Sequence, residues 1–328
     1  MKRLSGSTAL LLISIAFATQ ARAANPEHVK QLLQTKECKG CDLSNARLKG
    51  ASLKGANLEG ANLEGVYLYK ASLVGANLSR ANIKSADLGD SNMQGINFSG
   101  SDLTNTNLKG NDMTGANFEN ANLSEAVLEC NQRNRTKLGY ANLKKANLSN
   151  ANLKGVWLQG ANLAGADLNY ADLSPDTAES GRTIYTIYSN VSSANLSDAN
   201  LSDTNLYRAI FFRANLNNAK LTNANLNDAY LVMAQLMGAN LMKASLREAN
   251  LQRANLSNAN LSNADLVKSK LVDANLTNAI LKSARLVDIN MSGANLMGAD
   301  ISGAEMRKNK LCRVTMPDGT KTEESCDK

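Results

Sequence analysis

A bulky apolar residue recurs at every fifth position through most of the chain, from 43 to 173 and again from 196 to 311. A small residue, most often Ala, stands two places before it, as in Ala56-Asn57-Leu58. Five residues advance an α-helical side chain by about 500°, which would spread the leucines around every face of a helix. In a flat strand, an odd period would send successive leucines to opposite faces. The pattern therefore predicts a chain that turns once per unit and coils, with Ala and Leu pointing inward.

The repeated motif A-(N/D)-L-x-x resembles the consensus of the pentapeptide repeat family, and the resemblance covers nearly all of 43–311. It implies an all-β fold, a right-handed quadrilateral β-helix with four units per coil and Leu as the central inward residue. Four units per coil place residues 20 apart on one face. Phe98 should then stack on Phe118, and Met93 should lie beneath Met113, since a widened core layer must be matched by the next.

The pattern divides the chain into six segments. A break in the period separates two blocks of repeats, because the second block does not continue the first in phase. The predicted segments are a signal peptide at 1–23, an N-terminal cap at 24–42, a first repeat block at 43–173, a linker or bulged loop at 174–195, a second block at 196–311 and a C-terminal cap at 312–328.

The first segment has the features of a secretory signal. Lys2 and Arg3 precede an apolar run at 9–18, and Ala21-Arg22-Ala23 supplies a small-x-small cleavage site. The run is too short to span a membrane, although an uncleaved N-terminal anchor is the alternative interpretation. The C-K-G-C-D-L opening and the T-M-P-D-G segment near the end resemble exported cyanobacterial members of the family, which implies a periplasmic or thylakoid-lumen location.

The five cysteines occur in three places. Export permits disulfides, so Cys38 with Cys41 and Cys312 with Cys326 are candidate bridges. The C-x-x-C spacing of the first pair also admits a redox or zinc role, but two thiolates supply only half of a zinc site. Cys130 is the odd residue, either free or available to a partner.

A solenoid exposes its core and its strand edges at both ends, so caps are expected. Asn25-Pro26-Glu27 predicts the start of a short helix, whose apolar stripe of Val29, Leu32 and Leu33 should cover the first coil. Within the break, 183–188 has strong β propensity and is predicted to pair against the flank of the solenoid. A smaller disturbance at 129–137 places Arg133 at a central position, which predicts an outward bulge.

Composition and charge argue against a conventional enzyme. Aromatic residues make up 4% of the chain, and the formal charge of +7 falls to +4 when the predicted signal is removed. The single histidine, His28, rules out any mechanism that needs two imidazoles. Phosphate-binding, dinucleotide-binding and metalloprotease motifs are absent from the sequence. We predict no catalytic residue, cofactor or metal, and we interpret the aspartates before the leucines as solvated corner groups.

Two groups of side chains are candidates for binding. Arg133, Arg135, Lys137, Lys144 and Lys145 form the densest basic segment, which is either an anion patch or a solvated loop. Trp157, Tyr207, Phe212 and Tyr230 occupy outward positions and either mark a surface for a protein partner or pack under the 174–195 loop.

These observations favour a non-catalytic interaction, scaffold or regulatory adaptor protein of the periplasm or thylakoid lumen, with an unknown protein partner. A second hypothesis comes from family members that mimic DNA and protect topoisomerases, but the signal peptide and the basic charge disagree with it. A third is a thiol redox or ion-binding module at the end caps. Nucleic acid binding is not expected, because the positive charges are interspersed with negative ones.

Overall fold

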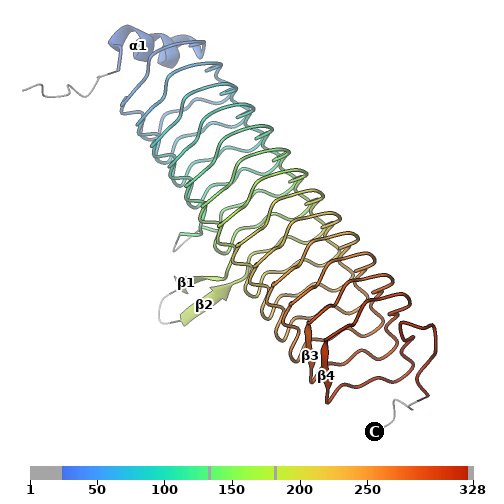
Figure 1. Cartoon of the computed structure of the whole chain (residues 1–328). Coiled ribbons are helices and arrows are strands. Elements are labelled where there is room, and N and C mark those ends of the chain that lie inside the picture. The colour runs from blue at the N-terminus through green and yellow to red at the C-terminus, as the bar shows by residue number, and fades with distance from the viewer. Residues whose placement is uncertain (1–23, 132–133, 181–182, 324–328) are drawn as a thin grey trace, which may run out of the picture.

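The computed structural model describes residues 24–131, 134–180 and 183–323. The chain winds into one elongated solenoid, with helix α1 (Pro26–Thr35) at one end and the C-terminal segment at the other (Figure 1). Four short strands accompany the coils: β1 (Asp176–Ser180), β2 (Thr183–Ile187), β3 (Arg285–Val287) and β4 (Glu305–Arg307). The predicted signal peptide at 1–23 lies outside the described residues.

Successive coils are joined by parallel bridges between residues 20 positions apart. Asn57 pairs with Asn77, for example, and Asn77 pairs with Asn97. Near the C-terminus the same pairing extends into the parallel strands β3 and β4. A coil therefore consists of four five-residue units, and each unit stacks on its counterpart in the next coil.

The residue before each central leucine has a defined hydrogen-bonding role. The side-chain Oδ1 of Asn77 accepts from the backbone N–H of Ser79 at 3.1 Å, and the Nδ2 of Asn97 donates to the same Oδ1 at 3.0 Å. Asp87 likewise accepts from the N–H of Gly89 at 3.0 Å. These residues are partly buried rather than solvated, because they satisfy backbone groups at the turns and connect neighbouring coils.

Each unit turns at its fifth residue, which adopts a left-handed conformation. Glycine takes this position without a steric penalty, as at Gly60, where φ is 64°. Side chains also occupy it, including Lys70 with φ of 59° and Arg208 with φ of 55°. For a residue other than glycine, the left-handed conformation costs about 1–2 kcal/mol. Stacking on identical turns above and below must offset that cost.

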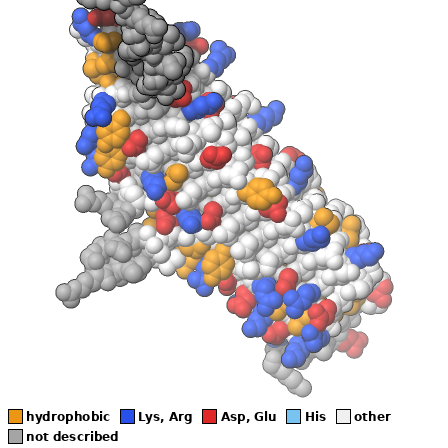
Figure 2. Space-filling model, turned by 60° about the vertical axis from the view of Figure 1, so that its left-hand side comes forward, with side chains coloured by type: hydrophobic (Ala, Val, Ile, Leu, Met, Phe, Trp, Pro, Cys, Tyr) orange, Lys and Arg blue, Asp and Glu red, His pale blue; other side chains and the backbone are white. Residues whose placement is uncertain are grey.

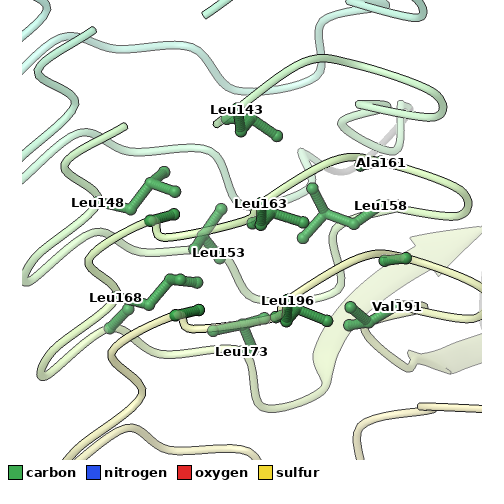
Figure 3. Close-up of a cluster of buried hydrophobic side chains, with 14 of the residues drawn as sticks. Leu143, Leu148, Leu153, Leu158, Ala161, Leu163, Leu168, Leu173, Val191 and Leu196 are labelled. Carbon is green, nitrogen blue, oxygen red and sulfur yellow. The ribbon is translucent and has the colours of Figure 1, made fainter. Parts of the chain in front are cut away.

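The core is a stack of leucines and alanines enclosed by the coils. Leu148 and Leu163 are 1% and 0% exposed, and Figure 3 shows leucines from successive coils pointing into the same interior. The rings of Phe98 and Phe118 stack with centroids 5.1 Å apart, which confirms the pairing predicted from their spacing of 20. Each buried leucine contributes about 1.5–3 kcal/mol relative to an exposed one.

Helix α1 caps the N-terminal end as predicted. Asn25 is its N-cap and accepts from the N–H of Glu27 at 3.0 Å, and Pro26 begins the helix. Leu32 is fully buried in the core, whereas Leu33 is 46% exposed, so the apolar stripe is narrower than predicted. The imidazole Nδ1 of His28 accepts from the N–H of Asp42 at 3.0 Å, which fixes the helix on the first coil.

The coils continue in one stack across the break in the period. Trp157 bridges directly to Asn190, and Asp172 bridges directly to Asn205, so the coil before the break packs on the coil after it. The inward pattern resumes at the fully buried Val191, one unit before the predicted restart at 196. Figure 3 shows Leu173, Val191 and Leu196 within the same core.

At the C-terminal end the chain turns back along the last coil. Thr315 forms an antiparallel bridge with Lys321, and Gly319 provides the left-handed residue of the turn with φ of 85°. The N–H of Met316 donates to the carbonyl of Thr320 at 2.7 Å. Cys326, the predicted partner of Cys312, lies outside the described residues. None of the described helices is long and apolar enough to cross a bilayer.

Candidate functional site

Two insertions leave the solenoid at the same corner. The first lies between Val127 and Lys137 and the second between Asp172 and Asn190. One column of stacked bridges runs through residues 127, 152 and 172, and the next column runs through 137, 157 and 190. Each insertion leads from the first column to the second, so both insertions join the same two sides of the coil. Figure 1 shows both projecting from this side of the solenoid. We call this column boundary the hairpin corner.

The second insertion forms an antiparallel hairpin of β1 and β2. Asp176 pairs with Ile187 at its base and Ser180 with Thr183 near its tip. The prediction that 183–188 pairs against the solenoid flank is therefore wrong. The segment pairs with the adjacent strand β1 instead, because this pairing closes a much shorter loop than pairing with the solenoid would.

Arg135 connects the first insertion to the base of the hairpin. Its Nε donates to the carbonyl of Gly155 at 2.8 Å, and one terminal nitrogen donates to the carbonyl of Val156 at 3.2 Å and also to that of Tyr188. Burial lowers the pKa of this guanidinium, but arginine remains charged at any physiological pH. The charge-assisted bonds therefore hold β2 in place on the solenoid.

The base of β1 packs against the first insertion through Asp176 and Cys130. A Cβ on Gly155 would lie 2.9 Å from both the Asp176 Cβ and the Cys130 Sγ, so only glycine allows this approach. Burial raises the pKa of Asp176 and outweighs hydrogen bonds from the backbones of Thr177 and Cys130. Burial also raises the pKa of the Cys130 thiol, which disfavours the reactive thiolate.

The other flank of the first insertion is tied to the preceding coils through Asp90. The Tyr69 hydroxyl donates to one Asp90 carboxylate oxygen at 2.8 Å, and the amides of Asn131 and Asn134 donate to the other. Desolvation would raise the pKa of Asp90, but the hydrogen bonds, led by that of Tyr69, lower it overall. This carboxylate is therefore a structural anchor for the loop.

The interior of the hairpin corner is more polar than the rest of the core. Ser91, Asn111, Thr136 and Ser189 are buried at positions where other units have alanine. The N–H of Ser91 donates to the Asn111 Oδ1 at 2.6 Å, and the Ser189 hydroxyl donates to the carbonyl of Leu153 at 3.2 Å. These side chains satisfy backbone groups that the insertions displace from the regular turn pattern.

A hollow of about 530 Å³ opens beside the hairpin on its C-terminal side. It is lined by Tyr188, Arg208, Ile210, Asp228 and Tyr230, and we call it the hairpin groove. Tyr188 and Tyr230 are 39% and 41% exposed. Figure 2 shows hydrophobic and basic side chains together beside the hairpin. Hot spots of protein–protein interfaces are enriched in aromatic residues and arginine, which is the combination found here.

Three of the four predicted partner-surface residues gather at this groove. Tyr230 lines it, and Phe212 contacts the Tyr230 ring with centroids 6.3 Å apart. Tyr207 stacks with Arg208, whose guanidinium lies 5.0 Å from the ring centroid. Trp157 lies farther toward the N-terminus in the same column of bridges as Asn190, Ile210 and Tyr230.

The sequence interpretation missed several groove residues. Ile210 replaces the usual Asn, and this substitution in an outward position was the available signal. Tyr188 belongs to the insertion, where no repeat pattern applies. Arg208 pairs with Asp228 at 3.7 Å, a contact between left-handed turn positions of successive coils. That pair could be recognised only after the register was known.

The predicted anion patch is divided between different environments. Arg135 is engaged with backbone carbonyls, and the Lys137 Nζ lies 3.5 Å from the Asp112 carboxylate. Lys144 and Lys145 are exposed on the next side of the coil. Arg133 lies outside the described residues. Anion binding by this segment stays a prediction.

Within the described part of the chain, no group of three or more His, Cys, Asp or Glu residues is arranged to hold a metal ion. Cys38 and Cys41 form a disulfide beneath α1 and are 0% and 4% exposed. Near this bridge, the Nδ1 of His28 accepts from the N–H of Asp42, a contact that holds the cap on the first coil.

The fold and its pattern define a β-solenoid built from five-residue units. A family model described as pentapeptide repeats matches several overlapping stretches of the chain, and together they cover most of it. The chain therefore belongs to the pentapeptide repeat family. The matched residues are 37–68, 61–100, 91–129, 134–163, 146–174, 189–228, 211–242, 244–282 and 274–308.

Solved structures with a similar fold include HetL, a pentapeptide repeat protein involved in heterocyst differentiation regulation from the cyanobacterium Nostoc sp. strain PCC 7120. It is 29% identical, the alignment covers 92% of this chain and 100% of HetL, and the TM-score is 0.51. QnrB1, a plasmid-mediated fluoroquinolone resistance protein, is 20% identical over 72% of this chain and 89% of its own, with a TM-score of 0.26.

A pentapeptide repeat protein from the Arabidopsis thaliana thylakoid lumen is 30% identical over 34% of this chain and 68% of its own, with a TM-score of 0.16. No curated protein matches the chain.

Proposed function

We propose that the chain is an exported, non-catalytic interaction or scaffold protein that contacts a protein partner through the hairpin corner. The observation that carries the proposal is the concentration of exposed aromatic residues and arginines at the groove where the otherwise regular solenoid is interrupted. Many other stretches of the repeat present ladders of asparagine amides, which are poor anchors because they are already hydrogen-bonded to one another.

Similarity to HetL supports a regulatory role. HetL is involved in the regulation of heterocyst differentiation, and its whole length aligns with this chain. We propose that this chain acts as a regulatory adaptor, with the right-handed, four-sided coil expected for the family providing a rigid rod.

The proposed location is the periplasm or thylakoid lumen. The basic residues, apolar run and small-x-small site at 1–23 support export. The Cys38–Cys41 disulfide is consistent with an oxidising compartment. Fractionation of cells that express the full chain tests the location. Recovery of the uncleaved chain in the cytosol would refute it.

The two alternatives have less support. A DNA-mimic that protects topoisomerases needs a cytosolic location and an acidic surface, whereas this chain has a net charge of +7. A redox role at Cys38 and Cys41 needs an accessible thiolate, and both side chains are buried beneath α1. An effect of the chain in a gyrase supercoiling assay would support the first alternative. A reduction potential in the catalytic range, measured for Cys38 and Cys41, would support the second.

The interaction proposal is tested by proximity labelling with the full chain in its native compartment. The wild type is compared with Tyr230→Asn and with Tyr67→Asn, which changes the same repeat position on another side of the coil. We expect a reproducible set of labelled proteins that survives Tyr67→Asn and is reduced by Tyr230→Asn. A label pattern identical to that of an unrelated exported protein would refute the proposal.

A further inference from the structure

We infer that the hairpin corner binds an extended polypeptide segment of a partner protein, which pairs with the outer edge of β2 and places an apolar side chain in the hairpin groove. The inference rests on the proposed interaction function and specifies the chemistry of its partner. It requires a free strand edge, a groove continuous with that edge, and a charge pattern that selects the segment.

The outer edge of β2 is the free edge. Among the described residues, β2 pairs only with β1 in a two-stranded sheet. The β1 side contacts the first insertion, because Asp176 accepts a hydrogen bond from the backbone of Cys130. The bases of both strands, at Asp176 and Ile187, lie against Gly155. Figure 1 shows β2 on the opposite, C-terminal side of the hairpin. A two-stranded hairpin is marginally stable alone, so a third strand would add both hydrogen bonds and order.

The groove begins where β2 ends. Tyr188 follows Ile187 directly and forms one wall, and Ile210 and Tyr230, which bridge to each other from successive coils, also line the groove. The carbonyl of Tyr188 is held by Arg135, so this wall is fixed relative to the coils. A strand that runs along β2 toward its C-terminal end therefore reaches an aromatic-lined hollow, which suits an aromatic or branched apolar side chain.

The charges around the groove favour an acidic neighbour to that apolar anchor. Arg208 lines the groove, and Arg213 lies over the Phe212 ring, with its guanidinium 5.0 Å from the centroid. The only carboxylate in the groove lining is Asp228, which already pairs with Arg208 at 3.7 Å. The Arg208–Asp228 pair is neutral, so the net positive charge beside the groove comes from Arg213, next to the Phe212 ring that contacts Tyr230. A strand edge presents alternating N–H and C=O groups that only another polypeptide backbone can match in spacing, which favours a peptide over a sugar.

The probe is a phage-displayed library of random 12-residue peptides, selected on the mature protein and followed by titration of the synthetic peptides. We expect enrichment of sequences that combine an apolar residue with Asp or Glu. Tyr230→Asn and Ile210→Asn, which restore the repeat consensus, should each weaken binding by about tenfold or more, as expected at a hot spot. Tyr67→Asn is the matched control and should change the affinity less than about twofold.

Methylation of single peptide nitrogens gives a second readout that does not depend on changes to the protein. In strand pairing, the N–H groups of alternate residues face the partner strand. N-methylation should therefore abolish binding at every second position of the peptide and leave the positions between unaffected. A uniform effect, or no effect, would show that the peptide does not pair with β2 and would overturn the inference.

Other outcomes also decide the question. Selected peptides that bind Tyr230→Asn as tightly as the wild type would place their site elsewhere and overturn the inference. A concentration-dependent dimer that Tyr230→Asn dissociates would assign the corner to a second copy of this chain instead. Partners that proximity labelling loses with Tyr230→Asn, together with a uniform effect of N-methylation on the selected peptides, would leave the proposed interaction function standing while this docking mode fails.

Discussion

Leu281 and the residue before it provide a direct test of which side chains form the core. Leu281 is 0% exposed, whereas Ile280 is 42% exposed on the outside of the same unit. Both side chains are four-carbon branched groups, so Leu281→Ala and Ile280→Ala remove the same number of carbon atoms. The two variants differ only in the side of the coil from which those atoms are lost.

The expected magnitudes follow from burial. Truncation of a fully buried leucine to alanine costs about 3 kcal/mol, because a cavity remains in a close-packed core. That cost is roughly a hundredfold in the local opening equilibrium. Truncation of an exposed apolar side chain usually costs less than about 1 kcal/mol. Because each repeat contacts mainly its neighbours, the effect of Leu281→Ala should concentrate in the adjacent coils.

Native-state hydrogen exchange measures this locally. Suitable probes are the N–H of Leu281, which donates to the Asp300 carbonyl at 2.7 Å, and the N–H of Leu261, which donates to the Ile280 carbonyl at 2.7 Å. In Leu281→Ala these amides should exchange far faster, while amides near residue 60 keep their protection. Equal losses for the two variants would refute the inward assignment of the central residues.

Four further predictions concern other parts of the molecule. Leu148→Asp should prevent the surrounding coils from folding, since it buries an unpaired carboxylate at a position that is 1% exposed, and circular dichroism would detect the loss. Asn147→Ala should cost about 1 kcal/mol in denaturant unfolding, because it removes the bonds of Asn147 to Ser149 and Asn122; an unchanged midpoint would contradict the ladder role. Arg135→Ala should accelerate hydrogen exchange in β1 and β2 by about tenfold or more, while Lys145→Ala should not. Burial raises the folded-state pKa of Asp176 above its unfolded value, so the protonated carboxyl stabilises the hairpin. As the pH rises from the ordinary pKa of an aspartate to this raised pKa, the hairpin should lose protection in exchange rates corrected for the intrinsic effect of pH. Asp176→Asn should abolish this dependence.

The repeat pattern predicts which residues form the core, but it does not reveal the hydrogen-bonding role of the asparagine before each central leucine. A period of five identifies which side chains point inward, and it places Phe98 on Phe118 once the coil contains four units. It does not reveal that Asn77 accepts from the Ser79 amide and links to Asn97. That role depends on the turn conformation, which becomes evident only when the left-handed residues, such as Lys70, are located.

The hairpin corner was the least predictable region for a different reason. The segment 183–188 has strong β propensity, but propensity does not select a pairing partner, and the adjacent β1 was the nearest strand available. The fixing contacts come from Arg135, 53 residues away from Tyr188, and from Gly155. Neither residue belongs to the insertion that it holds, so no local pattern could identify them.

The same geometry explains why the corner suits a binding role. A regular solenoid side satisfies its outward polar groups within the ladder, and insertion of residues in one coil would normally disturb every coil after it. Here both insertions leave at one corner, and the coils beyond them resume their 20-residue register from Asn190 onward. The rod therefore retains its core while one corner gains a free strand edge and an aromatic groove. Adding partner contacts at the insertions costs the core little, because the buried leucines on both sides, such as Leu173 and Val191, remain stacked.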